Sequence, residues 1–184
     1  MSTHSARTAT AAVKRRRKHA GGRNDALGET LLLDRVDTEA ILEESYLDIS
    51  ALDLADEIQV VRLGVPAKLI DAMADDMGVS RSRILGWIKM PEATAKRKIK
   101  NGELLDTAWS ERVLALASLI GRVQRMVEES GNPTGFDAPA WLGGWLSDPN
   151  PAFGGVPPGG YMDTEKGSAL VSQILLQMQS GAYA

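Results

Sequence analysis

The chain contains no cysteine and only two histidines, His4 and His19, both near its N-terminus. Without cysteine there is no disulfide framework, no thiol nucleophile and no thiolate metal site. With both histidines in a polar arm, neither a histidine-based catalytic triad nor an ordinary zinc site is expected. The sequence therefore predicts no catalytic residue, no metal and no cofactor, and it fits the reducing cytoplasm of a bacterial-type cell.

Long apolar runs are also missing. None reaches the roughly 20 residues of a membrane span, and the basic N-terminus lacks the apolar core and small-residue cleavage site of a secretory signal. Hydrophobic residues still make up 43% of the 184 residues, which is typical of a globular protein rather than a disordered one. We expect no membrane contact and either one ordinary domain or two small ones.

Charge is strongly segregated behind a net value of only −3. Residues 1–24 carry seven Lys or Arg and no acid, whereas residues 25–65 carry two bases and eleven acids. Residues 81–100 carry seven bases against the single acid Glu92. Because local charge decides which polyanion a protein meets, the basic arm and the basic block are both candidates for contact with nucleic acid.

The N-terminal third has little readable structure. Residues 1–24 lack apolar periodicity and are predicted to be a disordered basic arm, and residues 25–62 form an acidic segment of short helical and extended pieces. The run "KRRRK" fits phosphate tethering, a targeting-like tract or plain solubility. We favour phosphate tethering by Lys14, Arg15, Arg16 and Arg17.

Three short helices joined by tight turns are predicted between residues 66 and 100. Apolar residues from Leu69 to Met77 recur at helical spacing until Gly78, Ser80 can cap a second helix, and "KMP" at 89–91 leads into a third. This is the layout of a helix-turn-helix unit. We expect the basic third helix to enter a DNA major groove, with a solvated basic face as the alternative. The candidate DNA-binding residues in this region are Arg81, Arg83, Thr94, Lys96, Arg97, Lys98 and Lys100.

A longer helix follows, with an apolar stripe at near-heptad spacing. The stripe consists of Trp109, Val113, Leu116, Ile120, Val123 and Val127. It can pack against its own domain or form the seam of a dimer, and we favour packing within the domain.

The last fifty residues differ in composition. Asp137 caps one predicted helix, which contains Trp141 and Trp145, and Thr164 caps another. The inward side chains of the second helix are predicted to be Leu170, Val171, Ile174, Leu175 and Met178.

Between these helices lies "DPNPAFGGVPPGGY", residues 148–161, with four prolines and four glycines. A phosphate-binding loop is disfavoured because Pro157 and Pro158 lack backbone N–H donors and the glycine spacing is wrong. A flexible linker is the next alternative. We favour a rigid corner, since aromatic side chains crowd around the stretch.

The elements "WL", "PNPAFGG", "PP", "DTEKG" and "GAYA", in this order from Trp141 to Ala184, resemble the C-terminal toxin-binding domain of Xre/MbcA/ParS-type antitoxins. Residues 69–105 resemble the Xre-like helix-turn-helix region of the same family, so that the resemblance covers about residues 62–184. It implies a type II antitoxin that neutralises a RES-domain, NAD-consuming toxin by blocking its active site. Family members are usually dimeric and often repress their own operon, which implies operator DNA as a second partner.

The resemblance also implies site residues. Thr94 and Arg97 mark the DNA-reading helix. The matching positions of the toxin-binding domain are Trp141, Leu142, Asn150, Pro151, Gly154, Gly155, Thr164 and Gly167. We add Trp145 and Ile174, and expect Tyr183 to anchor in the toxin while the Ala184 carboxylate pairs with arginines of its NAD site.

The chain departs from the family pattern in two places. Lys89 stands where these antitoxins often have a helix-ending glycine. Pro157 and Gly159-Gly160 replace a threonine and two helix formers, so that a short local helix is expected to be frayed or absent here.

The sequence as a whole predicts a non-enzymatic, mainly α protein with a helix-turn-helix domain followed by a small helical toxin-binding lobe. The predicted segments are the arm at 1–24, the acidic segment at 25–62, the helix-turn-helix and dimerisation helix at 63–130, and the toxin-binding domain at 131–184. The alternatives are a stand-alone helix-turn-helix regulator whose C-terminal lobe only dimerises, and an enzyme.

Overall fold

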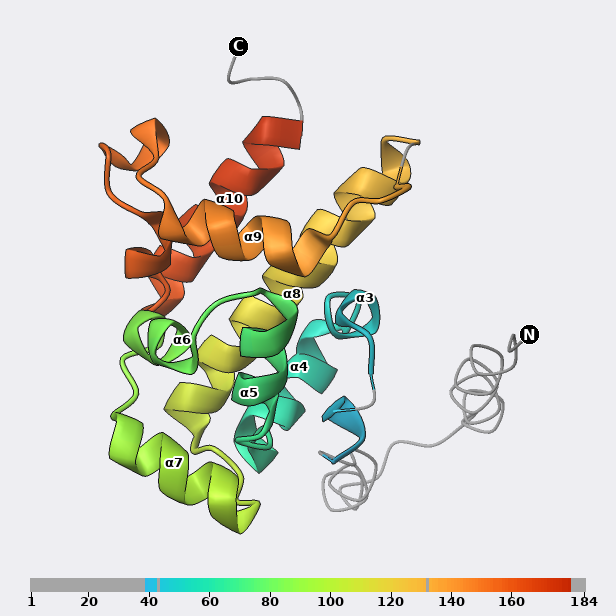
Figure 1. Cartoon of the computed structure of the whole chain (residues 1–184). Helices are drawn as coiled ribbons and strands as arrows, with labels where there is room; N and C mark the ends of the chain where they lie inside the picture. Colours follow the sequence, from blue (N-terminus) through green and yellow to red (C-terminus); the bar gives the residue numbers. More distant parts are fainter. Residues whose placement is uncertain (1–38, 43, 132, 180–184) are drawn as a thin grey trace, which may run out of the picture. The chain divides into compact units, whose positions relative to one another are not determined.

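A computed structural model describes residues 39–42, 44–131 and 133–179. The described residues all belong to one compact unit within residues 36–184. Every regular element in these ranges is a helix, apart from two isolated bridges, Pro66–Leu104 and Asn150–Val156 (Figure 1). The predicted mainly α fold is confirmed. The arm with Lys14, Arg15, Arg16 and Arg17, the chain up to residue 38, and Tyr183 and Ala184 lie outside the described residues.

The described helices follow one another with short connections. Their bounds are η1 (Glu39–Leu42), α3 (Tyr46–Ile49), α4 (Leu54–Leu63), α5 (Leu69–Asp76), α6 (Arg81–Trp87), α7 (Glu92–Asn101), α8 (Thr107–Glu129), α9 (Ala138–Ser147), η2 (Pro151–Phe153), η3 (Pro158–Tyr161) and α10 (Glu165–Gln179). The three short helices predicted between residues 66 and 100 are therefore present as α5, α6 and α7.

The helix ends follow local capping chemistry. The side chains of Ser80 and Asp137 accept hydrogen bonds from the backbone N–H groups three residues further on, at 3.2 Å and 2.9 Å. Thr164 Oγ1 does the same for Gly167 N at 3.1 Å, ahead of α10. Each cap satisfies a backbone donor that the first helical turn leaves without a partner. All three caps predicted from the sequence are confirmed.

Helix α8 forms the centre of the core. It contacts α3 and α4, which precede it in the chain, and α9 and α10, which follow it (Figure 1). Val113, Leu116 and Ile120 of its apolar stripe are completely buried, and Val123 is almost so. The stripe therefore packs within its own chain, as favoured from the sequence, and it is not available as the seam of a dimer.

The C-terminal lobe, here residues 133–179, shares one hydrophobic core with the helices before it. Buried apolar side chains from Ile41 to Leu175 form a single cluster. Two glycines allow the close approach: a Cβ atom on Gly143 would lie 2.3 Å from Met77 O, and one on Gly159 would lie 2.2 Å from Trp87 Nε1. The predicted second lobe is present, but it is built directly onto α5 and α6.

The expectation that the short helix near residue 158 is frayed or absent is wrong. Residues Pro158–Tyr161 form the 3₁₀ helix η3. Prolines 157 and 158 fix the entry into this turn, and the contact of Gly159 with Trp87 holds it against α6. Tertiary packing thus supplies what the local sequence lacks in helix propensity.

Candidate functional site

Helices α5, α6 and α7 follow one another through two turns of helix-turn-helix spacing. The four residues Met77–Ser80 join α5 to α6, with Gly78 at a φ of 62°, and the four residues Ile88–Pro91 join α6 to α7, with Lys89 at a φ of 52°. A short turn containing glycine is the usual connection in this motif. Ile84, Leu85 and Trp87 bury the inner face of α6. Its outer face exposes Arg81, Ser82, Arg83 and Gly86.

Several of the predicted DNA-binding cations have partners within the chain. Arg81 forms a two-pronged ion pair with Asp71 of α5, with Nη2 2.9 Å from Oδ2. Arg97 Nη1 lies 2.7 Å and 2.8 Å from the two carboxylate oxygens of Glu103. Lys98 donates to the carbonyl oxygen of Leu104 at 2.7 Å. These three side chains hold the motif together and have less freedom to reach DNA.

Glu103 forms ion pairs with Arg97 and Lys98 at the C-terminal end of α7. A hydrogen bond from Asn101, together with the positive charges of Arg97 and Lys98, holds the pKa of the Glu103 carboxyl below its ordinary value. The carboxylate thus stays ionised to a lower pH than an isolated glutamate and remains paired with these cations.

Other predicted cations are free. In the part of the chain that the structure describes, Arg83, Lys96 and Lys100 make no side-chain hydrogen bond or ion pair. All three are exposed, whereas Thr94 is half-buried. The geometry brings Arg83 onto the outer face of α6, and leaves Lys96 and Lys100 on the neighbouring helix α7.

The C-terminal lobe carries a chain of five aromatic rings. Phe136 and Trp141 have centroids 6.1 Å apart, Trp141 stacks on Trp145 at 6.2 Å, Trp145 meets Phe153 edge-on at 6.0 Å, and Phe153 lies 5.2 Å from Tyr161. One end of this chain reaches solvent, where Phe136 and Trp141 are 38% and 37% exposed. The other end is the half-buried Tyr161, which packs on the buried ring of Phe153.

Four predicted toxin-binding residues have structural roles in the described fold. Asn150 Oδ1 accepts from Ala152 N at 3.0 Å and caps η2, and Thr164 caps α10. Gly167 is buried where a Cβ atom would lie 1.9 Å from Tyr161 O, and Ile174 belongs to the core. Each of the four stabilises the lobe from within.

The remaining predicted positions lie nearer the surface. Trp141, Pro151, Gly154 and Gly155 are exposed, and Trp145 is half-buried. The two glycines have φ values of 67° and 83°, and Gly155 N donates to Asn150 O at 3.0 Å. Positive φ favours glycine, so these residues fix the corner at 150–156 as the sequence predicted.

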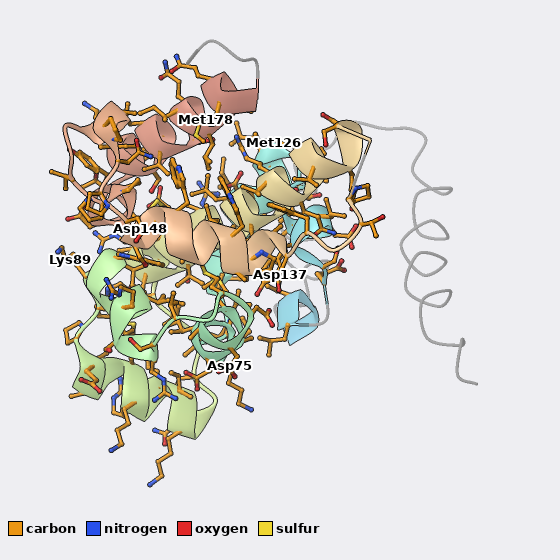
Figure 2. The ribbon with its side chains drawn as sticks, turned by 45° about the horizontal axis from the view of Figure 1, so that its top comes forward. Asp75, Lys89, Met126, Asp137, Asp148 and Met178 are labelled. Atoms are coloured by element: carbon orange, nitrogen blue, oxygen red, sulfur yellow. The ribbon has the colours of Figure 1, made fainter. Side chains whose placement is uncertain are left out.

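Several apolar side chains of the lobe are exposed although the sequence did not predict it. Leu170 and Met178 were expected to point inward, yet both are 40% exposed. Met178 lies near the end of α10, beyond the packed core (Figure 2). Phe136, Val156 and Leu176 are exposed as well. Leu176 was readable in principle, because it lies opposite the buried face of α10 marked by Val171, Ile174 and Leu175.

The described helices thus combine a helix-turn-helix region, which is typical of DNA-binding proteins, with a C-terminal lobe that has an exposed apolar face. Residues 56–118 match the model of the antitoxin Xre-like helix-turn-helix domain, and residues 135–181 match that of the antitoxin Xre/MbcA/ParS C-terminal toxin-binding domain. A relative from Sphingobium sp. (strain YBL2), named a Prs ADP-ribosylating antitoxin, is 44% identical over 129 residues, 70% of this chain and 81% of the relative.

The chain therefore belongs to the Xre/MbcA/ParS family of antitoxins. It has the toxin-binding domain of that family, which implies a toxin as partner, and a helix-turn-helix domain, which implies DNA binding. Among the described helices, none is both long enough and apolar enough to cross a membrane.

Proposed function

We propose that the chain neutralises a RES-domain toxin by covering its NAD-consuming active site with the C-terminal lobe, and that it represses its own operon through α5 and α6. One observation carries the first part: the matched toxin-binding domain exposes large apolar side chains around an aromatic chain. Large aromatic residues at the centre of an interface supply most of its binding energy. The name of the Sphingobium relative adds support, because ADP-ribosylation uses NAD as its donor.

Trp141 is the proposed anchor of the toxin interface. Its ring is exposed on one side and held on the other by the stacked ring of Trp145, so that little ordering is needed on binding. Helix α10 is described up to Gln179, and the residues beyond it include the proposed contacts Tyr183 and Ala184. In this proposal Trp141 binds the toxin surface and the residues Tyr183 and Ala184 enter the NAD site.

For DNA we propose α6 as the helix that reads base edges, with α7, which the sequence favoured, as the alternative. The second helix of a helix-turn-helix unit lies in the major groove, with its N-terminal residues against the bases. Ser82 and Arg83 occupy that position on α6 and are exposed. Lys96 and Lys100 then hold phosphates, and Arg97 acts mainly through its ion pair with Glu103.

The proposed homodimer needs a surface other than the α8 stripe, because that stripe is buried in the monomer. Light scattering on the purified chain should give twice the monomer mass. A monomer at micromolar concentration would remove the dimer from the proposal.

Co-expression with a neighbouring RES-domain toxin gene tests the proposed function. The chain should co-purify with the toxin and restore growth, and Trp141→Ala should weaken both effects. Lys100→Ala is the matched control, because this exposed residue lies on α7 and should affect DNA binding alone. A chain that neither binds nor rescues would favour the rival reading, a stand-alone regulator whose C-terminal lobe only dimerises. A toxin-free sample that turns over NAD would favour an enzyme.

A further inference from the structure

The apolar stripe of α10 continues past the part of the helix that the core covers. Val171 and Ile174 are buried, and Met178 follows them at the spacing of one helix face. Met178 is nevertheless 40% exposed. Figure 2 shows it near the end of α10, beyond the packed core. The last residue of the stripe is therefore open to a partner, and in the proposed function that partner is the toxin.

Met178 differs from the other described methionines in its access to solvent. Four of the others lie in the core and are at most 4% exposed, namely Met73, Met77, Met90 and Met162. Met126 on α8 is half-buried. The chain contains no cysteine, so that all of its sulfur atoms are methionine thioethers. Because the oxidation of sulfur follows exposure, we expect Met178 to react before the other described methionines.

We propose that Met178 is a site of reversible oxidation, and that its oxidation weakens toxin binding. The assignment rests on the proposed function of the C-terminal lobe. Hydrogen peroxide transfers one oxygen atom to the thioether sulfur, which is oxidised by two electrons to a sulfoxide, and the peroxide is reduced to water. Methionine sulfoxide reductases restore the thioether. A protein without thiols thus has a reversible redox site on the surface that meets its partner.

The sulfoxide changes the exposed surface of α10 rather than the core. Leu170 and Leu176 are also exposed on this helix, so that Met178 adds to an apolar surface. A thioether is apolar, whereas the oxygen of a sulfoxide binds water that has to be removed when a partner covers it. We expect oxidation to raise the Kd for the toxin about tenfold. The stability of the chain should hardly change, because Met178 lies outside the core.

Oxidation of the purified full-length chain tests the site itself. After brief treatment with hydrogen peroxide, digestion and mass spectrometry should show the sulfoxide at Met178 before it appears at Met126 or at the four core methionines. Tm should shift by less than about 2 °C when Met178 alone is oxidised. Oxidation of Met126 or of a core methionine ahead of Met178 would overturn the assignment.

Calorimetric titration with the toxin, after removal of the peroxide, tests the consequence. The oxidised chain should show a Kd about tenfold above that of the unmodified chain, and a methionine sulfoxide reductase should restore the original value. Met178→Leu keeps an apolar side chain without sulfur, so its Kd should not respond to peroxide. Met178→Gln should raise Kd without any peroxide. Met126→Leu is the matched control and should respond to peroxide as the unmodified chain does.

The proposal is overturned if Kd stays the same once Met178 is a sulfoxide. A loss of affinity that persists in peroxide-treated Met178→Leu would also overturn it, because the effect would then come from another residue. In both cases the unmodified chain still binds the toxin, and the proposed function of the lobe stands. If the unmodified chain binds no toxin, that function fails and the proposal for Met178 fails with it.

Discussion

The indole ring of Trp87, at the end of α6, lies directly against Gly159 of η3. A Cβ atom on Gly159 would fall 2.2 Å from Trp87 Nε1 and 2.6 Å from two carbon atoms of the ring. Trp87 is itself buried, at 6% exposure. The base of the toxin-binding lobe is therefore packed on the helix that we propose to read DNA, with no space for a side chain between them.

The first prediction concerns this contact. Gly159→Ala should destabilise the protein by about 1–3 kcal/mol, because an added methyl group in a packed contact forces its neighbours apart. Gly160→Ala is a matched control, since a Cβ atom there meets nothing within 4 Å and its φ is not positive. Urea denaturation followed by tryptophan fluorescence measures both variants. Equal stability of the two would contradict the close contact.

The second prediction uses a pair of adjacent glycines in α9. Gly143→Ala should destabilise the protein by about 1–3 kcal/mol, because its Cβ atom would lie 2.3 Å from the backbone oxygen of Met77. Gly144→Ala should instead stabilise it by about 0.5–1 kcal/mol, since Gly144 is exposed within a helix and has open space around it. Thermal unfolding of both variants gives the comparison, and the opposite order would refute the packing of α9 on α5.

Features that depend on local sequence could be predicted, whereas the contacts of Gly143 and Gly159 could not. Ser80, Asp137 and Thr164 follow local rules of helix capping, and the stripe from Val113 to Val123 repeats at helical spacing, so each was readable. The contact between Gly159 and Trp87 joins residues 72 positions apart and leaves no local pattern. Sequence reasoning therefore found the helices of the lobe but not its attachment to the helix-turn-helix unit.

The DNA-reading helix stays a prediction. Basic residues are densest on α7, and the sequence favoured that helix because of them, of the helix and turn before it, and of the resemblance at Thr94 and Arg97. The structure pairs Arg97 with Glu103, which lies beyond the end of α7, and it leaves Arg83 free on α6. Whether a charge is available depends on such pairing, which composition cannot reveal.

The third prediction separates these two helices. Arg83→Ala should cost about 1–3 kcal/mol of binding to DNA from upstream of the gene and should relax the preference over an unrelated duplex. Arg97→Ala should have a smaller effect on that preference, because its guanidinium is already paired with Glu103. Fluorescence anisotropy with both duplexes measures the two variants. A larger loss of preference for Arg97→Ala would restore α7 as the reading helix.

The fourth prediction concerns the toxin interface. Trp141→Ala should weaken toxin binding by about 2 kcal/mol or more, roughly thirtyfold in Kd, because exposed aromatic anchors dominate interface energy. Calorimetric titration of the toxin measures the change, and circular dichroism checks that the variant keeps its helices. Ile174→Val is a useful comparison: Ile174 is buried, so it should lower stability by about 0.5–1.5 kcal/mol with little change in Kd.

The central claim is that the C-terminal lobe blocks an NAD-consuming active site. The most direct measurement is NAD turnover by a purified RES-domain toxin while the full-length chain is titrated into the assay. We predict that turnover falls to zero once the chain matches the toxin in the ratio of their complex, and that a chain ending at residue 179 forms a complex which still consumes NAD. Undiminished NAD turnover in the presence of excess full-length chain would contradict the account.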